Sequence, residues 1–226
     1  MIQIEKFTKN YPLVCLVAAN IVPLYGVAFA GWDAFSIVLL YWSENLIIGF
    51  YNILKIAFVK VGEPIEQLGK LFVIPFFMVH YGGFCACHGY LILVLFDKKV
   101  GMTWADGPHL PCFFIFLELL FNVVRQLFAI VPTAFISAFA ALFISHGISF
   151  VSNYLIKGEY LHTNGRQLSN SPYERIVVMH IAIIVGAGLT MAIGSPVAIL
   201  IVLVALKTII DIQLHLSEHK KFAVAI

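Results

Sequence analysis

Six long apolar runs constrain this chain more than any other feature of its sequence. Each run is near the length of about 20 residues with which an α-helix crosses about 30 Å of hydrocarbon. The runs do not alternate between apolar and polar residues, and backbone groups in lipid are satisfied only in helices or closed barrels. Helices are therefore predicted over residues 11–30, 34–57, 70–96, 133–156, 174–194 and 196–216. The expected fold is an all-α, polytopic transmembrane helix bundle that forms a single integral membrane domain over residues 1–226.

The composition agrees with a protein that has lipid as its main solvent and partner. Apolar and aromatic residues make up 61% of the 226 residues, and charged residues make up 12%. Soluble domains usually contain about 45–50% apolar and about 25% charged residues. A secreted disulfide scaffold, a disordered chain and a cytosolic dinucleotide-binding enzyme are excluded. The formal net charge of +2 is too small for a nucleic-acid partner.

Residues 112–131 are predicted to form one more helix, which either crosses the membrane or lies in its interface. Its polar residues form a single stripe: Glu118, Asn122, Arg125 and Gln126. If this helix does not cross, Lys157 and the later basic residues fall on the same side as Lys6, Lys55 and Lys70. The positive-inside rule favours that arrangement. The sequence predicts six spans plus one interfacial helix, with both termini cytoplasmic, and seven spans as the alternative.

Several ionisable residues fall inside the predicted spans, where a charge costs at least about 2.5–3.5 kcal/mol near the bilayer centre. Counted at about 1.5 Å per residue from the cytoplasmic end of each span, four of them lie about 13–18 Å deep. His180 and Asp211 fall about one turn below that level, His215 lies near the boundary, and His88 lies apart at about 27 Å. The four at one level are Glu44, His80, His146 and Lys207.

Imidazole and carboxylate groups that converge in this way are typical ligands of zinc, iron or manganese. A metal in a dry cavity activates water for hydrolysis. The first hypothesis is therefore a membrane-embedded, metal-dependent hydrolase that acts on a lipid or lipid-linked substrate. Glu44 is its expected catalytic residue. The expected metal ligands are His80, His146, His180, Asp211 and His215.

Two other functions fit the same residues. His80 and His146 share a level on different helices, as two axial ligands of a b-type haem would. Alternatively, the buried histidines, carboxylates and Lys207 mark the pathway of a small transporter or proton relay. The chain is short for a transporter and has no inverted repeat, so this alternative favours a homo-oligomer.

Four groups of residues also carry a resemblance to a known family. Together they resemble a bacterial family of polytopic membrane proteins known only as a domain of unknown function, over nearly the whole chain. The resemblance implies a multi-pass protein of the bacterial inner (cytoplasmic) membrane, and it implies no substrate, cofactor or reaction. The groups are Tyr41-Trp42-Ser43-Glu44-Asn45, His80-Tyr81-Gly82-Gly83-Phe84 with His88-Gly89, Pro172-Tyr173-Glu174-Arg175-Ile176 with His180, and Gly194-Ser195-Pro196 with Lys207-Thr208, Asp211 and His215.

Overall fold

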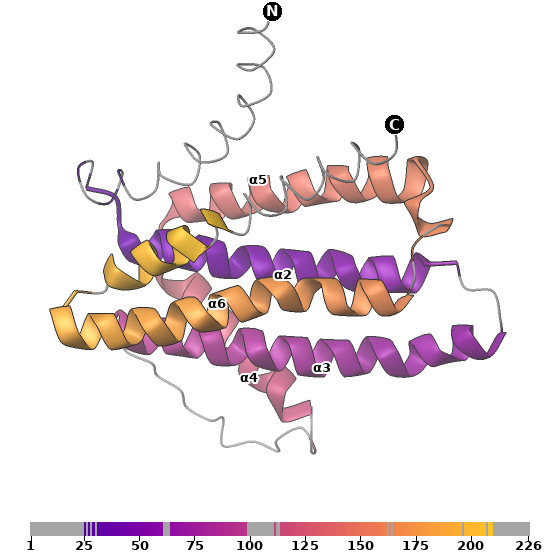
Figure 1. Cartoon of the computed structure of the whole chain (residues 1–226), viewed down its shortest axis with the longest axis horizontal. Helices are drawn as coiled ribbons and strands as arrows, with labels where there is room; N and C mark the ends of the chain where they lie inside the picture. The colour runs from indigo at the N-terminus through magenta and orange to yellow at the C-terminus, as the bar shows by residue number, and fades with distance from the viewer. Residues whose placement is uncertain are drawn as a thin grey trace, which may run out of the picture. The chain divides into compact units, whose positions relative to one another are not determined.

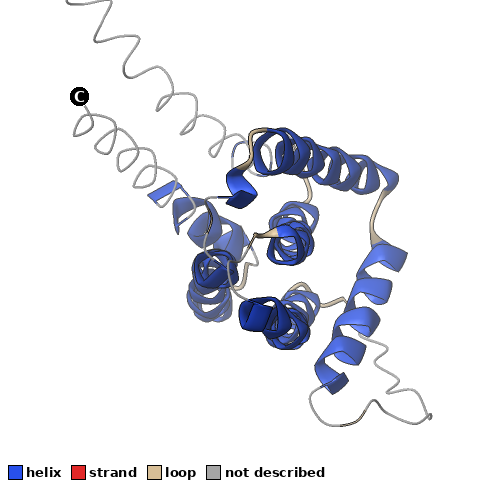
Figure 2. Cartoon of the chain, turned by 90° about the vertical axis from the view of Figure 1, so that its right-hand side faces the viewer, coloured by secondary structure: helices blue, strands red, loops and turns tan. Residues whose placement is uncertain are grey.

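The computed structural model of the chain is helical, as the apolar runs predict. Helices, turns and loops account for the described residues, with no strand among them (Figure 2). Two compact parts make up the chain, namely residues 38–180, and residues 1–37 with 181–226. The structure describes residues 25, 27, 29, 31–60, 64–98, 111, 114–161, 163, 165–195, 197–206 and 208–209.

Helices α2 and α3 form an antiparallel pair in the first of these parts (Figure 1). Helix α2 covers Ala34–Phe58, within one residue of the predicted span. Helix α3 covers Pro64–Leu95 and begins six residues before the predicted start at residue 70. The Trp42 indole donates a hydrogen bond to the Cys85 carbonyl (2.9 Å), whereas the Lys70 ammonium donates to the Val59 carbonyl (2.6 Å). Residue numbers thus rise along α2 in the direction in which they fall along α3, so the two helices are antiparallel.

Helix α5 runs parallel to α2. It covers Thr133–Ser149 and continues without a break as a π-helix, η2 (Phe150–Ile156), so that both together match the predicted span 133–156. The Tyr51 hydroxyl donates to the Phe143 carbonyl (3.0 Å), and the Tyr154 hydroxyl donates to the Lys55 carbonyl (2.7 Å). Later residues of α2 therefore meet later residues of α5 and η2. The main buried cluster lies here and includes Ile56, Phe77, Tyr81, Phe150, Tyr154 and Ile176.

Helix α4, which covers Ile115–Ile130, packs obliquely across α3 (Figure 1). Its 16 residues rise about 24 Å, less than the thickness of a hydrocarbon core. Because α5 is parallel to α2 and antiparallel to α3, the chain begins α5 at the end of the bundle where α3 finishes. This direction is the one expected if residues 112–131 do not cross; the number of spans, six or seven, stays a prediction.

Helix α6 covers Gly165–Ile193 and begins nine residues before the predicted start at residue 174. Pro172 lies inside this helix, in the part that precedes the predicted span. Only Arg175–Ile193 is apolar enough to be a membrane span. Hydropathy therefore predicts the membrane-crossing part of the helix, while the helix itself continues through the polar residues that precede it.

Four helical segments in the described part of the chain are long and apolar enough to cross a membrane, as expected of a multi-pass protein. A fifth, shorter apolar helix covers Val197–Leu206. It packs closely on α6, since a Cβ on Gly186 would lie 2.6 Å from the Ile199 Cα atom. The predicted first span, apart from three isolated positions, and the end of the predicted sixth span lie outside the described residues. The four long segments are Ala34–Phe58, Gln67–Leu95, Thr133–Ile156 and Arg175–Ile193.

Candidate functional site

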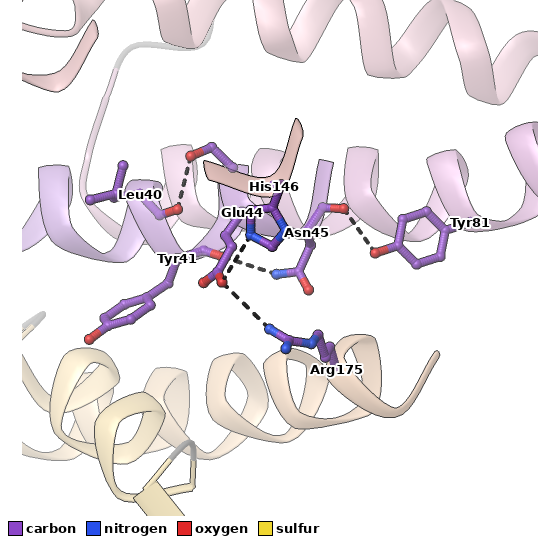
Figure 3. Close-up of polar contacts among 8 residues, drawn as sticks. Leu40, Tyr41, Glu44, Asn45, Tyr81, His146 and Arg175 are labelled. Carbon is purple, nitrogen blue, oxygen red and sulfur yellow. Dashed lines mark hydrogen bonds and ion pairs between the residues drawn. The ribbon is translucent and has the colours of Figure 1, made fainter. Parts of the chain in front are cut away.

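The Tyr41–Asn45 segment of α2 presents different side chains to different helices, because successive residues are turned by about 100°. The Trp42 side chain and the Asn45 backbone carbonyl face α3. The Trp42 indole donates to the Cys85 carbonyl, and the Tyr81 hydroxyl donates to the Asn45 carbonyl at 3.0 Å. These two bonds hold α2 against α3 in one rotational setting. Glu44 is consequently directed away from that contact, toward α5 and α6 (Figure 3).

The glycines of α3 let its neighbours approach closely. A Cβ on Gly89 would lie 2.6 Å from the Trp42 ring and 2.7 Å from the Val123 side chain. A Cβ on Gly83 would lie 3.3 Å from Phe116 of α4. Small residues serve this purpose at helix contacts in membranes. These glycines therefore have a packing role, and the close approach of the Trp42 ring to α3 depends on Gly89.

Glu44 forms the centre of a three-residue cluster that joins α2, α5 and α6. Its Oε1 atom lies 3.5 Å from Nη1 of Arg175 and 3.7 Å from Nε2 of His146 (Figure 3). The side chains are 20% exposed for Glu44, 28% for His146 and 51% for Arg175. We call Glu44, His146 and Arg175 the Glu44 cluster. It combines a guanidinium, a carboxyl group and an imidazole, contributed by three different helices.

His80 of α3 pairs with Tyr173 of α6. The His80 Nδ1 atom lies 2.8 Å from the Tyr173 hydroxyl, which is a hydrogen-bond distance. The rings of Phe76 and Phe84 lie on either side of the imidazole. Tyr173 precedes the membrane span of α6, and burial raises the pKa of its phenol. The phenol therefore keeps its proton and can donate the hydrogen bond to an unprotonated Nδ1 of His80.

His88 of α3 and His180 of α6 form the third pair. The His88 Nε2 atom lies 2.9 Å from the His180 Nδ1 atom. The His88 side chain is buried, with 2% of its surface exposed, whereas His180 is exposed. A neutral imidazole has one donor and one acceptor nitrogen, but a protonated one has two donors. The hydrogen bond therefore survives when one ring is protonated and is lost when both are.

The structure brings together some of the predicted site residues and separates others. Glu44 and His146 meet, as their common depth predicts. His80 and His180 contact Tyr173 and His88 instead of the Glu44 cluster. The predicted isolation of His88 is wrong: α3 and α6 are parallel but do not begin at one level, so depths counted separately from each span cannot be compared. Lys207, Asp211 and His215 lie outside the described residues.

Arg175, Tyr173 and His88 were not predicted as site residues. One signal was available for the two α3–α6 pairs. His80 and His88 are eight residues apart, and Tyr173 and His180 are seven apart. Both spacings return to about the same helix face after two turns, which is what two parallel helices need to form two contacts. Arg175 gave no such signal, since it lies at the edge of an apolar run.

No group of three or more histidine, cysteine, aspartate or glutamate side chains is placed to hold a metal ion within the part of the chain that the structure describes. The metal cluster expected from sequence is therefore not assembled by Glu44, His80, His146 and His180 alone. What the arrangement offers is a set of paired proton-binding groups between helices.

Comparison with known proteins returns one result. No curated protein and no solved structure matches the chain. A family described as a family of unknown function matches almost the whole sequence. Over residues 4–225, the chain belongs to this family, DUF6498.

Proposed function

We propose that this protein is a small transporter or proton relay that moves protons through paired side chains between its membrane helices. The observation that carries the proposal is the His88–His180 hydrogen bond of 2.9 Å. Ionisable residues in membrane spans are costly and usually serve a pathway. Here they occur as pairs in direct polar contact, and each pair joins two helices.

The His88–His180 pair connects an exposed ring to a buried one. An imidazole accepts a proton at one nitrogen and releases another from its second nitrogen. A proton that binds Nε2 of His180 lets the Nδ1 proton pass to Nε2 of His88. His88 then carries the charge and releases the proton from its own Nδ1 atom. The step moves one proton and breaks no bond other than N–H.

The other histidines in the described residues follow the same pattern. His80 pairs with Tyr173, and His146 pairs with Glu44. Each of the four described histidines thus has a titratable partner on another helix. A b-type haem held by His80 and His146 would require both to leave these partners, so the pairs favour proton transfer.

A metal-dependent hydrolase is the other class expected from the sequence. Catalytic zinc usually takes three protein ligands and a water. Within the described helices the histidines occur in pairs, and the further expected ligands Asp211 and His215 lie outside them. The geometry therefore gives more support to proton transfer than to metal chemistry.

We also infer the orientation from the lysines. Four of them lie at one end of the part formed by residues 38–180. At this end the Lys70 ammonium donates to the Val59 carbonyl, and the Lys60 amide donates to the Tyr160 carbonyl. Lys98 lies at the other end, beside Asp97. By the positive-inside rule the lysine-rich end faces the cytoplasm, in the bacterial inner membrane that the motif resemblance implies. The four are Lys55, Lys60, Lys70 and Lys157.

Proton flux into reconstituted vesicles tests the function. The vesicles contain a pH-sensitive dye, potassium phosphate and valinomycin, and the external pH is lowered stepwise. Valinomycin balances the charge of uncoupled protons, and phosphate supplies an anion for a coupled route. We expect the wild type to acidify the interior faster than protein-free vesicles do, and His88→Phe and His180→Phe to lose this excess rate.

Tyr51→Phe is the matched control, because it removes a hydrogen bond between α2 and α5 and leaves the His88–His180 pair unchanged. It should retain the wild-type rate. Unchanged flux in both histidine variants, or a folded wild type that gives no excess flux, overturns the proposal.

A further inference from the structure

A guanidinium and an imidazole of the Glu44 cluster approach one and the same oxygen atom. Arg175 Nη1 and His146 Nε2 lie 3.5 Å and 3.7 Å from Oε1 of Glu44. Both distances exceed the 2.7–3.2 Å that is typical of an N–H···O hydrogen bond. Neither contact is therefore a short hydrogen bond. Arg175 and a protonated His146 would compete for this oxygen atom.

Arg175 has binding capacity that this contact does not use. A guanidinium carries five N–H donors in a planar fork that matches carboxylate or phosphate oxygens. Within the described residues, Arg175 makes one long contact to Glu44, and its side chain is 51% exposed. An oxyanion is the ligand class that this fork binds best.

The charge balance of the cluster couples anion binding to protonation. With His146 neutral, the charges of Glu44 and Arg175 cancel, and the sum over these three residues is zero. An anion alone would leave one negative charge, and a proton alone would leave one positive charge, in surroundings where an unpaired charge is costly. An anion and a proton bound together leave the net charge at zero.

We propose that the Glu44 cluster binds a monovalent oxyanion, a carboxylate or dihydrogen phosphate, together with one proton. The anion takes the N–H groups of Arg175, and Glu44 turns to the protonated His146. One N–H bond forms on His146, and no other covalent bond changes. The inference rests on the proposed function, because it names the substrate class that would travel with the proton.

The groups that face His146 are consistent with this role. From α2 they are the Glu44 carboxylate and the Tyr51 ring, which stacks at 6.5 Å between centroids, and from α6 the Arg175 guanidinium. The Tyr51 hydroxyl already donates to the Phe143 carbonyl. Tyr51 therefore positions the imidazole, while Glu44 remains the group that receives its added charge.

Calorimetric titration of the purified full chain in detergent tests the inference, with sodium acetate as the probe. Repeating the titration in two buffers with different ionisation enthalpies counts the protons taken up. We expect one proton per acetate, and an affinity that falls about tenfold per pH unit where His146 is neutral. Sulfate, whose second charge the cluster cannot balance, should bind more weakly than acetate.

Three variants separate the parts of the cluster. Glu44→Gln should still bind acetate but without proton uptake or pH dependence, because the anion then cancels Arg175 directly. His146→Gln should lose proton uptake and bind more weakly, and Arg175→Gln should not bind acetate. Arg125→Gln removes a guanidinium from α4, outside the Glu44 cluster; it is the control and should bind like the wild type. Circular dichroism and size-exclusion profiles establish that each variant is folded.

The two proposals fail separately. Acetate binding without proton uptake in the wild type, tighter binding of sulfate than of acetate, or a Glu44→Gln variant that keeps the wild-type pH dependence overturns the coupled site. Coupled acetate binding in detergent with no proton flux in vesicles overturns the proposed function alone. Proton flux that depends on His88 and His180, in a protein that binds neither acetate nor phosphate, overturns the coupled site alone.

Discussion

The imidazole nitrogens Nε2 of His88 and Nδ1 of His180 lie 2.9 Å apart, between two parallel helices of different axial level. His88 lies about six turns after the start of its candidate span at Gln67, whereas His180 lies about one and a half turns after Arg175. Their contact therefore depends on how far α6 is shifted along α3. No property of either span alone specifies that shift.

Removal of metal should leave proton transfer intact. The proposed steps use only N–H and O–H groups of the chain, so treatment with a chelator should not change the vesicle flux by more than the variation between preparations. The measurement is the dye assay before and after dialysis against EDTA, together with elemental analysis of the same sample. Loss of flux on dialysis and its return with zinc, iron or manganese would instead favour the metal-dependent class.

Gly89→Ala should destabilise the contact of α3 with α2 and α4. The new Cβ would lie 2.6 Å from the Trp42 ring and 2.7 Å from Val123, and overpacking of this kind costs about 1–3 kcal/mol. Thermal unfolding in detergent measures the effect. Gly69→Ala is the control on the same helix: nothing lies within 4 Å of its Cβ position, so it should be neutral or stabilising by about 0.5–1 kcal/mol. Equal effects of both substitutions would contradict the packing described.

Tyr81→Phe should weaken the α2–α3 contact modestly. It removes the hydroxyl that donates to the Asn45 carbonyl and keeps the ring that packs against Gly49. Single hydrogen bonds between membrane helices contribute about 0.6 kcal/mol on average, so the expected loss is about 0.5–1.5 kcal/mol. Tyr90→Phe, also on α3, is the control, because its hydroxyl makes no hydrogen bond within the described part of the chain. A larger loss for Tyr90→Phe would overturn this assignment.

Asp33→Ala should destabilise the start of α2. The Asp33 carboxylate accepts hydrogen bonds from the backbone amides of Phe35 and Ser36, at 3.3 Å and 3.0 Å, and from the Ser36 hydroxyl at 2.7 Å. Loss of such an N-cap costs about 0.5–2 kcal/mol. Asp33→Asn keeps an acceptor oxygen and should retain most of the stability. Hydrogen exchange of the first-turn amides measures both variants, and equal exchange rates would argue against the cap.

The membrane helices could be predicted closely wherever the edge of the apolar run coincides with the end of the helix. Helix α2 and the combined α5 and η2 are examples, because glycine and proline residues stop the helix where hydrophobicity also stops. Helices α3 and α6 begin earlier than predicted. The first turns of both helices are polar. A helix can extend beyond the membrane into water, because its backbone hydrogen bonds do not depend on the hydropathy of its side chains.

The chemical types of the site residues could also be predicted, but their partners could not. Glu44, His80, His146 and His180 stand out because ionisable groups are rare in lipid. Their pairing depends on the rotation and axial shift of each helix, which close contacts such as Gly89 with Trp42 decide. Arg175 joins Glu44 because α6 lies beside α2 at that level.

Hydrophobicity along the chain by itself determined that this protein is a helical membrane bundle, because the cost of exposing backbone and side chains to lipid or water is a local property of each segment. Only the tertiary structure decided that the described members of the expected cluster belong to three separate groups, Glu44 with His146 and Arg175, His80 with Tyr173, and His88 with His180. Distances between helices arise from packing, and packing is a property of all the helices together.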